Sequence, residues 1–329
     1  MISGMEGILD RFFITNRAGS RAAIKLCSEY GKGRFFDRFF RYSVIPFILN
    51  FDRDSFDPSN RKVVDIEVSH YCFNYTGVTM ALSAIAEALY YGYVPLVDVR
   101  QKGAFNWTDF FEQPFSVSET AECDIYPRSV GAYKWHGSMI GNKPDMEAWY
   151  KIYALFYRLN EETSGYVDGE FMRMFQDIDE KKTLGILCRG TDYVKLKPRG
   201  HFVQPDICTI IEEAGKLMES GRFTHIYLAS EDGGLAERVK KAFPGKVLEN
   251  SREYYDQAYF EGDHNKIGDL NSEMSDDRIR AKDLSYISSI NILSKCGGLV
   301  AGNCGGSQAA VCINGGRYDY CHVYDLGLY

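Results

Sequence analysis

The sequence predicts an α/β protein with two domains, each built on a parallel sheet. Short apolar runs alternate with amphipathic segments over most of the chain, as in strand–helix–strand units. With 329 residues, the chain is longer than a single hydrophobic core usually serves. Polar and glycine-rich loops follow several of the apolar runs. In a parallel sheet such loops gather at the carboxyl ends of the strands, where ligands bind.

The composition is that of an ordinary globular protein, with 45% hydrophobic and 25% charged residues. A net charge of -7 argues against a nucleic-acid partner, because it leaves no strongly basic face overall. The nine cysteines lack paired metal-ligand spacing, which indicates buried thiols in a reducing compartment rather than a metal site. No apolar run is long enough to cross a bilayer, and residues 1–10 lack a signal-peptide core, so we expect a cytoplasmic protein.

Residues 1–60 form an N-terminal segment that is both basic and aromatic. Phenylalanines alternate with arginines, as in the stretch 34–41, which predicts helices with one aromatic face and one basic face. Two interpretations are open. The segment either packs on the first domain or makes peripheral contact with an anionic membrane, which would place the protein at the inner membrane face.

The first domain, residues 61–178, is predicted to be Rossmann-like and to hold a βαβ unit. An alternating run over 62–68 predicts a strand, and a buried apolar stripe predicts a helix over 77–91. Residues 94–99 read as the next strand. Two neighbouring strands that are connected through a helix in this way run parallel to each other.

Two further parts of this domain carry candidate ligand contacts. His70 and Asn74 lie in the loop after the first strand, so they either face a cleft and meet the acceptor or cap local structure. The loop-rich segment 105–140 is aromatic, and its rings either stack on sugars or pack in the core. A helix over 145–159 follows.

The second domain, residues 179–329, begins after the charged run 177–182. Its predicted strands are 184–187, 224–229, 246–248, 298–301 and a terminal run over 322–329. Its predicted helices are 207–217, 235–242, 283–294 and 308–313. The acidic stretch 249–283 lacks apolar periodicity, so we expect a surface excursion there.

A charged loop follows the strand that ends at Leu187. Its candidate ligand groups are Arg189, Thr191, Asp192, Lys195, Lys197, Arg199 and His201. Guanidinium and ammonium groups at the carboxyl end of a buried strand suit an anion, most simply a phosphate. The alternative is a basic surface loop on an ordinary α/β domain.

A glycine-rich loop, residues 302–307, opens from the last buried strand and leads into a helix. Glycines let backbone N–H groups approach a ligand, and a helix N-terminus favours an anion. The loop is neither GxGxxG nor a phosphate loop ending in Gly-Lys-Ser/Thr, so it does not indicate NAD or a nucleoside triphosphatase. Across the sheet edge from Arg189, it predicts the second half of a phosphate site.

These residues resemble a known family. Cys188–Asp192, reading CRGTD, is similar to the His-x-Arg-Arg-Gly/Thr-Asp motif of the α1,6- and protein O-fucosyltransferase superfamily. Residues 306–308 resemble its donor loop, and the runs 189–193, 195–201 and 229–232 are similar to bacterial members from surface-polysaccharide clusters. The resemblance extends over about 180–325, is weaker over 62–115 and is absent from the first 60 residues. It implies a GT-B-like fold, with two Rossmann-like domains facing across a cleft and the sugar nucleotide held by the second.

The resemblance also implies roles for the matching residues. Arg189 would bind the donor β-phosphate, and Thr191 and Asp192 would shape its loop. Ser307 and Gln308, beside Gly306, would hydrogen-bond the diphosphate. Apart from the roles carried over by position, we expect Lys195, Lys197 and Glu231 to contact the donor as well. Leu187 stands where the motif has His, and Gly190 where it has a second Arg, and both departures weaken the case for GDP-fucose.

We therefore expect a metal-independent inverting glycosyltransferase, in first place a fucosyltransferase that uses GDP-fucose on a cell-surface glycan or polysaccharide precursor. Fixed cations stabilise a departing nucleoside diphosphate without a metal or other cofactor. An inverting displacement needs a general base, for which Asp192, His201 and Glu231 are candidates. The alternatives are a GT-B transferase with another nucleotide-sugar donor and a non-catalytic member that binds nucleotide or glycan.

Overall fold

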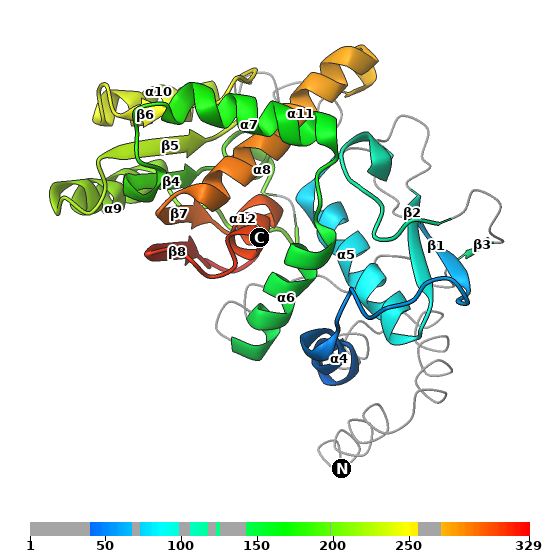
Figure 1. Ribbon diagram of the computed structural model, residues 1–329. Coiled ribbons are helices and arrows are strands. Elements are labelled where there is room, and N and C mark those ends of the chain that lie inside the picture. The colour runs from blue at the N-terminus through cyan, green and yellow to red at the C-terminus, as the bar shows by residue number, and fades with distance from the viewer. Residues whose placement is uncertain are drawn as a thin grey trace. The chain divides into compact units, whose positions relative to one another are not determined.

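The computed structural model describes residues 40–67, 73–98, 106–117, 123–125, 143–197, 199–255 and 271–329. The chain divides into two compact units, Met1–Asn160 and Glu161–Tyr329. Both are α/β structures with a parallel sheet, which confirms the predicted class (Figure 1). The predicted cleft between two domains and the predicted boundary at residue 178 stay predictions.

The first unit has three parallel strands in the order β2-β1-β3. They are β1 (Val63–Glu67), β2 (Val94–Asp98) and β3 (Cys123–Ile125). Helix α5 (Tyr75–Tyr90) connects β1 to β2, which is the predicted βαβ unit. Every residue of α5 except Thr76 is buried. A helix that is apolar nearly all round belongs inside a unit, and α5 lies there.

Aromatic side chains fill much of the first unit. The rings of Trp107 and Phe111 stack with centroids 4.5 Å apart, and Phe73 lies 5.5 Å from Phe110. All four side chains are buried, so the described part of the aromatic segment serves as packing rather than as an open stacking surface. The other helical elements of the unit are η1 (Phe40–Val44), α4 (Ile45–Asn50), η2 (Trp107–Asp109) and α6 (Lys143–Phe156).

The second unit has five parallel strands in the order β6-β5-β4-β7-β8. These strands are β4 (Thr183–Leu187), β5 (His225–Ala229), β6 (Val247–Leu248), β7 (Gly298–Gly302) and β8 (Tyr320–Tyr324). The chain builds outward from β4 to one side and then returns to its other side at β7. The sheet is therefore doubly wound, and its switch point, where such sheets bind ligands, lies between β4 and β7.

Helices cover both faces of this sheet (Figure 1). They are α7 (Glu161–Phe175), α9 (Ile207–Glu219), α10 (Gly233–Ala242), α11 (Asp276–Lys295) and α12 (Gly305–Asn314). Alternate residues of a strand face opposite sides, so Leu184 and Ile186 pack with Ile210 of α9. A side chain at Gly185 would come within 2.8 Å of Leu293, so α11 approaches the other face closely. All of β4 is buried, as predicted for a strand covered on both faces.

Two helices depart from the sequence prediction. Helix α7 is absent from the prediction, because Gly165 and Gly169 and many polar residues interrupt its apolar stripe; it packs on α11. Helix α8 (Thr191–Leu196) occupies part of the charged loop. A polar sequence predicts a loop, but six residues are enough for a short helix held by its surroundings.

The predicted surface excursion over 249–283 is largely exposed in its described parts, but it contains the start of a helix and an anchored loop. Helix α11 begins at Asp276, and Asn250 is only 3% exposed, because polar side chains rather than apolar ones fasten this stretch. The terminal strand is shorter than predicted. After Tyr324 the chain turns and pairs antiparallel with residues 200–203, through a bridge between Phe202 and Leu328.

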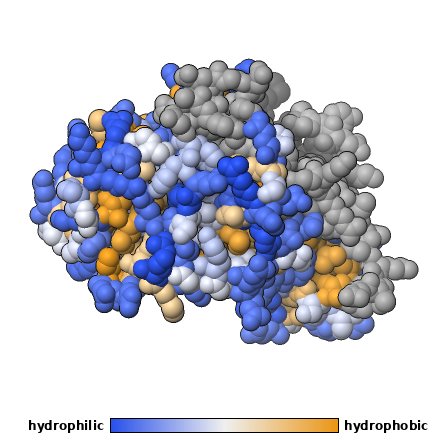
Figure 2. Space-filling model, turned by 90° about the horizontal axis from the view of Figure 1, so that it is seen from above, coloured by the Kyte–Doolittle hydropathy of each residue, from blue (hydrophilic) through white to orange (hydrophobic). Residues whose placement is uncertain are grey.

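No helix in the described part of the chain is both long and apolar enough to cross a bilayer. On the face shown in Figure 2, hydrophilic residues predominate and apolar ones form separate patches. Residues 1–39, most of the basic and aromatic segment, lie outside the described residues. Peripheral membrane contact by that segment therefore stays a prediction.

Candidate functional site

Three loops meet at the carboxyl edge of the second sheet. Leu187 of β4 pairs with Ala229 of β5 on one side and with Ala301 of β7 on the other. Arg189, Glu231 and Asn303 each follow that rung by two residues. Parallel strands that end at the same level bring such residues together. The predicted meeting of the charged loop with the glycine-rich loop thus has a direct basis in the register.

Arg189 and Glu231 form an ion pair across β4 and β5. Nε of Arg189 lies 3.2 Å from Oε1 of Glu231, and the side chains are 18% and 22% exposed. In this partly buried setting the attraction is stronger than on an open surface. The ion pair keeps the guanidinium at this edge of the sheet, where its planar set of N–H donors suits a forked contact to a phosphate.

Gly190 has no room for a side chain. A Cβ atom at this position would lie 2.1 Å from Oδ2 of Asp232. Asp232 is 1% exposed and caps α10, because Oδ1 accepts a hydrogen bond from the N–H of Leu235 at 3.0 Å. The structure therefore explains why position 190 cannot carry the second arginine of the family motif. The carboxylate of Asp232 fills the space that a side chain at 190 would need.

Cys188 precedes this contact and is fully enclosed. Burial, followed by the charges of Glu231 and Asp232, raises the pKa of its thiol far above the ordinary value. The thiol therefore stays protonated at neutral pH and does not act as a nucleophile.

The glycine-rich loop forms the N-terminus of α12. Ser307 is fully buried, and its Oγ accepts a hydrogen bond from the N–H of Cys304 and donates to the C=O of Cys304, both at 3.0 Å. Nε2 of Gln308 donates to Oδ1 of Asn303 at 2.9 Å. Both predicted diphosphate ligands thus shape the loop. The first-turn N–H groups at Gly305 and Gly306, with the helix dipole, are the groups suited to an anion.

Gln204 and Asn303 join the end of the charged loop to the end of β7. Nε2 of Gln204 donates to the C=O of Asn303 at 2.9 Å. The two side chains are 8% and 0% exposed, yet Oε1 of Gln204 and Nδ2 of Asn303 have no hydrogen-bond partner among the described residues. Buried polar atoms are normally satisfied, so these two are where a ligand or a water would bond. Sequence reasoning missed both, although each is a polar residue beside a predicted strand or helix end.

The remaining basic residues are exposed on α8 and on the stretch after it. Lys197 has a φ of 44°, in the left-handed region that a non-glycine residue seldom adopts. The backbone beyond it is fixed, because the N–H of Tyr329 donates to the C=O of His201 at 3.0 Å and the N–H of Gly200 donates to the C=O of Tyr329 at 3.1 Å. Lys195, Arg199 and His201 are likewise exposed.

Other candidates are placed only in part. Asn74 caps α5, since its side chain accepts a hydrogen bond from the N–H of Gly77 at 2.8 Å. His70 lies outside the described residues, as do the side chains of Thr191 and Asp192, whose backbone opens α8. Within the described ranges, no group of three His, Cys, Asp or Glu side chains is arranged to hold a metal ion.

No family model and no curated protein matches the chain in sequence. Solved structures do match it. Fucosyltransferases are among them. One is NodZ from Bradyrhizobium, at 11% identity and a TM-score of 0.43, over 77% of this chain and 93% of that one. Another is NodZ α-1,6-fucosyltransferase soaked with GDP-fucose, at 10% identity and a TM-score of 0.46, over 76% of this chain and 92% of that one. A third is a mutant of Arabidopsis thaliana FUT1 in complex with GDP, at 10% identity and a TM-score of 0.45, over 85% of this chain and 73% of that one.

Proposed function

We propose that the protein is a glycosyltransferase whose nucleotide-sugar donor binds at the carboxyl edge of the second sheet. The observation that carries this proposal is the ion pair of Arg189 with Glu231 beside the switch point of a doubly wound sheet. A guanidinium kept at the sheet edge and the glycine-rich N-terminus of the helix that follows the adjacent strand suit the two phosphates of a nucleoside diphosphate.

The chemistry follows from where charge develops. Glycosyl transfer breaks the bond between the sugar and the β-phosphate, and negative charge builds on the departing diphosphate. A fixed arginine stabilises that charge more strongly in the transition state than in the bound donor. We propose that it does so without a divalent ion, and that the displacement inverts the sugar.

Glu231 takes part by orienting Arg189. A carboxylate beside the guanidinium reduces its net attraction for a phosphate, so the benefit of Glu231 lies in geometry rather than charge. This assignment leaves Asp192 and His201 as the candidates for the general base that accepts the proton of the acceptor hydroxyl.

We propose GDP-fucose as the donor and a cell-surface glycan or polysaccharide precursor as the acceptor. The support is the run Arg189–Tyr193 and the loop 306–308, which resemble those of fucosyltransferases. A transferase with another nucleotide-sugar donor is the second candidate, because Gly190 and Leu187 replace two polar residues of the fucosyltransferase motif.

A thermal-shift panel of GDP, UDP, ADP and CMP, each with EDTA, tests the donor. A ligand that binds only the folded state raises the melting temperature. At a concentration of 100 times its Kd, it adds about 2.7 kcal/mol to the free energy of unfolding. Stabilisation by GDP is expected, and it should survive EDTA. Stabilisation by UDP instead would favour the other transferase, and no response to any nucleotide would overturn the donor site.

A further inference from the structure

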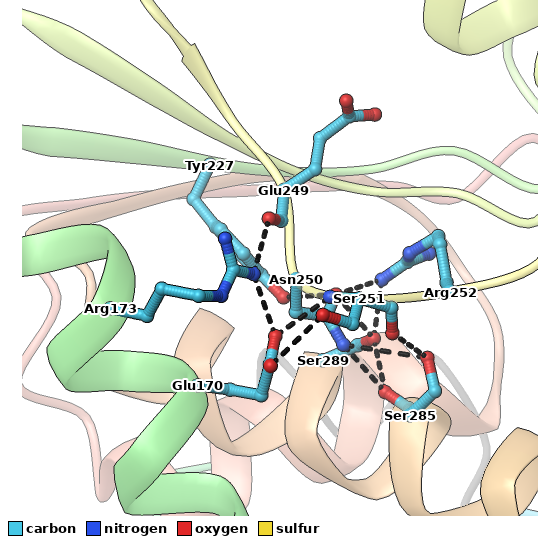
Figure 3. A network of polar contacts seen from close by, with 9 residues as sticks. All are labelled: Glu170, Arg173, Tyr227, Glu249, Asn250, Ser251, Arg252, Ser285 and Ser289. Atoms are coloured by element: carbon cyan, nitrogen blue, oxygen red, sulfur yellow. Dashed lines mark hydrogen bonds and ion pairs between the residues drawn. The ribbon is translucent and has the colours of Figure 1, made fainter.

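The loop after β6, residues 249–255, is fastened to helix α7 on one side (Figure 3). Glu170 of α7 accepts hydrogen bonds from the N–H of Ser251 at 2.7 Å and from its Oγ at 3.0 Å. Arg173 donates to the C=O of Glu249 at 3.2 Å. Partial burial acts to raise the pKa of Glu170, but the bonds from Arg173 and Ser251 outweigh it and lower that pKa. The carboxylate thus stays charged and keeps the loop in place.

The same loop is fastened to helix α11 and the sheet through Asn250. Its Nδ2 donates to the C=O of Ser285 at 2.9 Å. Its Oδ1 accepts from the hydroxyl of Tyr227 at 2.9 Å and from Oγ of Ser289 at 3.2 Å. Figure 3 shows these groups converging on one point beside the sheet. A side chain with this many partners fixes the loop in one conformation.

Arg252 carries that rigidity to the donor site. Its guanidinium donates to Asn250 Oδ1 and Ser289 Oγ, and its other terminal nitrogen donates to the C=O of Ser230 at 2.5 Å. Ser230 directly precedes Glu231, the partner of Arg189. One side chain thereby joins helix α11 to the backbone of the corner that orients the proposed phosphate-binding arginine.

Two backbone bonds from the same loop complete the attachment. The N–H of Tyr255 donates to the C=O of Glu231 at 2.8 Å, and the N–H of Gly233 donates to the C=O of Tyr255 at 3.2 Å. The corner at 230–233 is thus held on both sides of Glu231. Among the described residues of this loop, Arg252 is the one whose side chain bonds both to this corner, at Ser230, and to helix α11, at Ser289.

The charge of Arg252 has no carboxylate partner within ion-pair distance among the described residues, and its buried Nε has no hydrogen-bond partner there. Burying part of a charge without an ionic partner is costly. An uncharged side chain would serve stability alone at lower cost. The contacts to Ser230, Asn250 and Ser289 instead suit a planar donor that must reach three acceptors at once.

We propose that Arg252 is a positioning residue of the donor site, acting through Ser230 and Glu231 on Arg189. The proposal rests on the proposed function. It extends that function by adding a residue from the loop after β6, which lies on the side of β5 away from β4. Arg252 belongs to none of the motifs that carry the resemblance to fucosyltransferases.

A double-mutant cycle tests this coupling. Arg252→Met and Glu231→Gln are made singly and together, and the Kd for GDP is measured by calorimetry well below the melting temperature. Arg252→Met should weaken GDP binding about tenfold, and much less in the Glu231→Gln background, because residues in one network are not additive. Additive losses would overturn the proposal.

Arg278→Met is the matched control. Arg278 pairs with Glu253 of the same loop at 3.1 Å and does not touch Ser230. It should leave the Kd within about twofold, as a surface pair does. Should Arg252→Met fail to fold, Arg252→Lys replaces it in the cycle under the same criteria. A wild type that binds no nucleotide contradicts the proposed function, whereas a wild type that binds GDP, with Arg252→Met matching Arg278→Met, contradicts only the role of Arg252.

Discussion

At the scale of single residues, the proposed donor site depends on contacts that join loops distant in sequence. Arg189 is in the resembling motif and Glu231 was a candidate base, but their pairing appears only in the structure. It follows from the sheet order, which sets β5 beside β4. A sequence pattern predicts that both residues end strands, and it does not predict which strands are neighbours.

Gly190 gives a residue-scale prediction. Gly190→Ala places a Cβ atom 2.1 Å from the carboxylate of Asp232, which cannot move without uncapping α10. We expect a loss of about 2 kcal/mol in the free energy of unfolding, as for overpacking of a filled site. Denaturant unfolding measures it. The control is Gly169→Ala on α7, where no atom lies within 4 Å of the new Cβ, so that its stability should rise by up to about 1 kcal/mol. Equal effects at both sites would contradict this packing.

At the scale of elements, strong periodicity predicts well and polar stabilisation does not. The buried strand β4 and the helix α9 agree with the sequence prediction, since apolar side chains determine both. Helix α7 and the loop 249–255 do not, because hydrogen bonds to Glu170 and Asn250 hold them. Ser307 shows the same limit, since its hydroxyl could equally meet a ligand or cap α12, and the structure shows the cap.

The edge strand β8 is attached to α9 by one carboxylate. Glu213 accepts hydrogen bonds from the hydroxyl of Tyr320 at 2.5 Å, from Nδ1 of His322 at 2.6 Å and from the hydroxyl of Tyr324. Partial burial acts to raise its pKa, but these hydrogen bonds outweigh burial and lower it below the ordinary value. A lowered carboxyl pKa adds stability above the unfolded pKa of about 4.3, and that stability is lost as the pH falls through the folded pKa.

Glu213→Gln should therefore flatten the acid side of the stability profile. We expect the wild type to lose more free energy of unfolding than the variant does between about pH 6 and pH 3. Urea unfolding over that range measures the difference. Glu212→Gln, one residue away and exposed, is the control and should follow the wild type. If both variants track the wild type, Glu213 does not hold β8 to α9.

At the scale of the whole molecule, the sequence predicts the fold class and the edge of the sheet where the candidate residues gather. It does so because alternating strands and helices require a parallel sheet, and polar loops after buried strands collect at one edge. The details of the site depend on long-range contacts. Gln204 meets Asn303 and Arg252 meets Ser230 only once the chain is folded, and no local pattern marks either pair.

Arg189 provides the most direct test of the central claim, that a fixed arginine at this edge stabilises the departing diphosphate. Turnover of GDP-fucose and melting temperature are measured on the same preparation of Arg189→Ala, with Arg278→Ala as the control. We expect turnover to fall by roughly 10²–10³-fold, about 3–4 kcal/mol, as on loss of a preorganised donor. Arg189→Lys should not restore it, because lysine lacks the planar fork. The melting temperature should fall only modestly, and Arg189→Ala/Glu231→Gln should recover it by removing the unpaired carboxylate. A large loss of stability with near-normal turnover per folded molecule would contradict the claim.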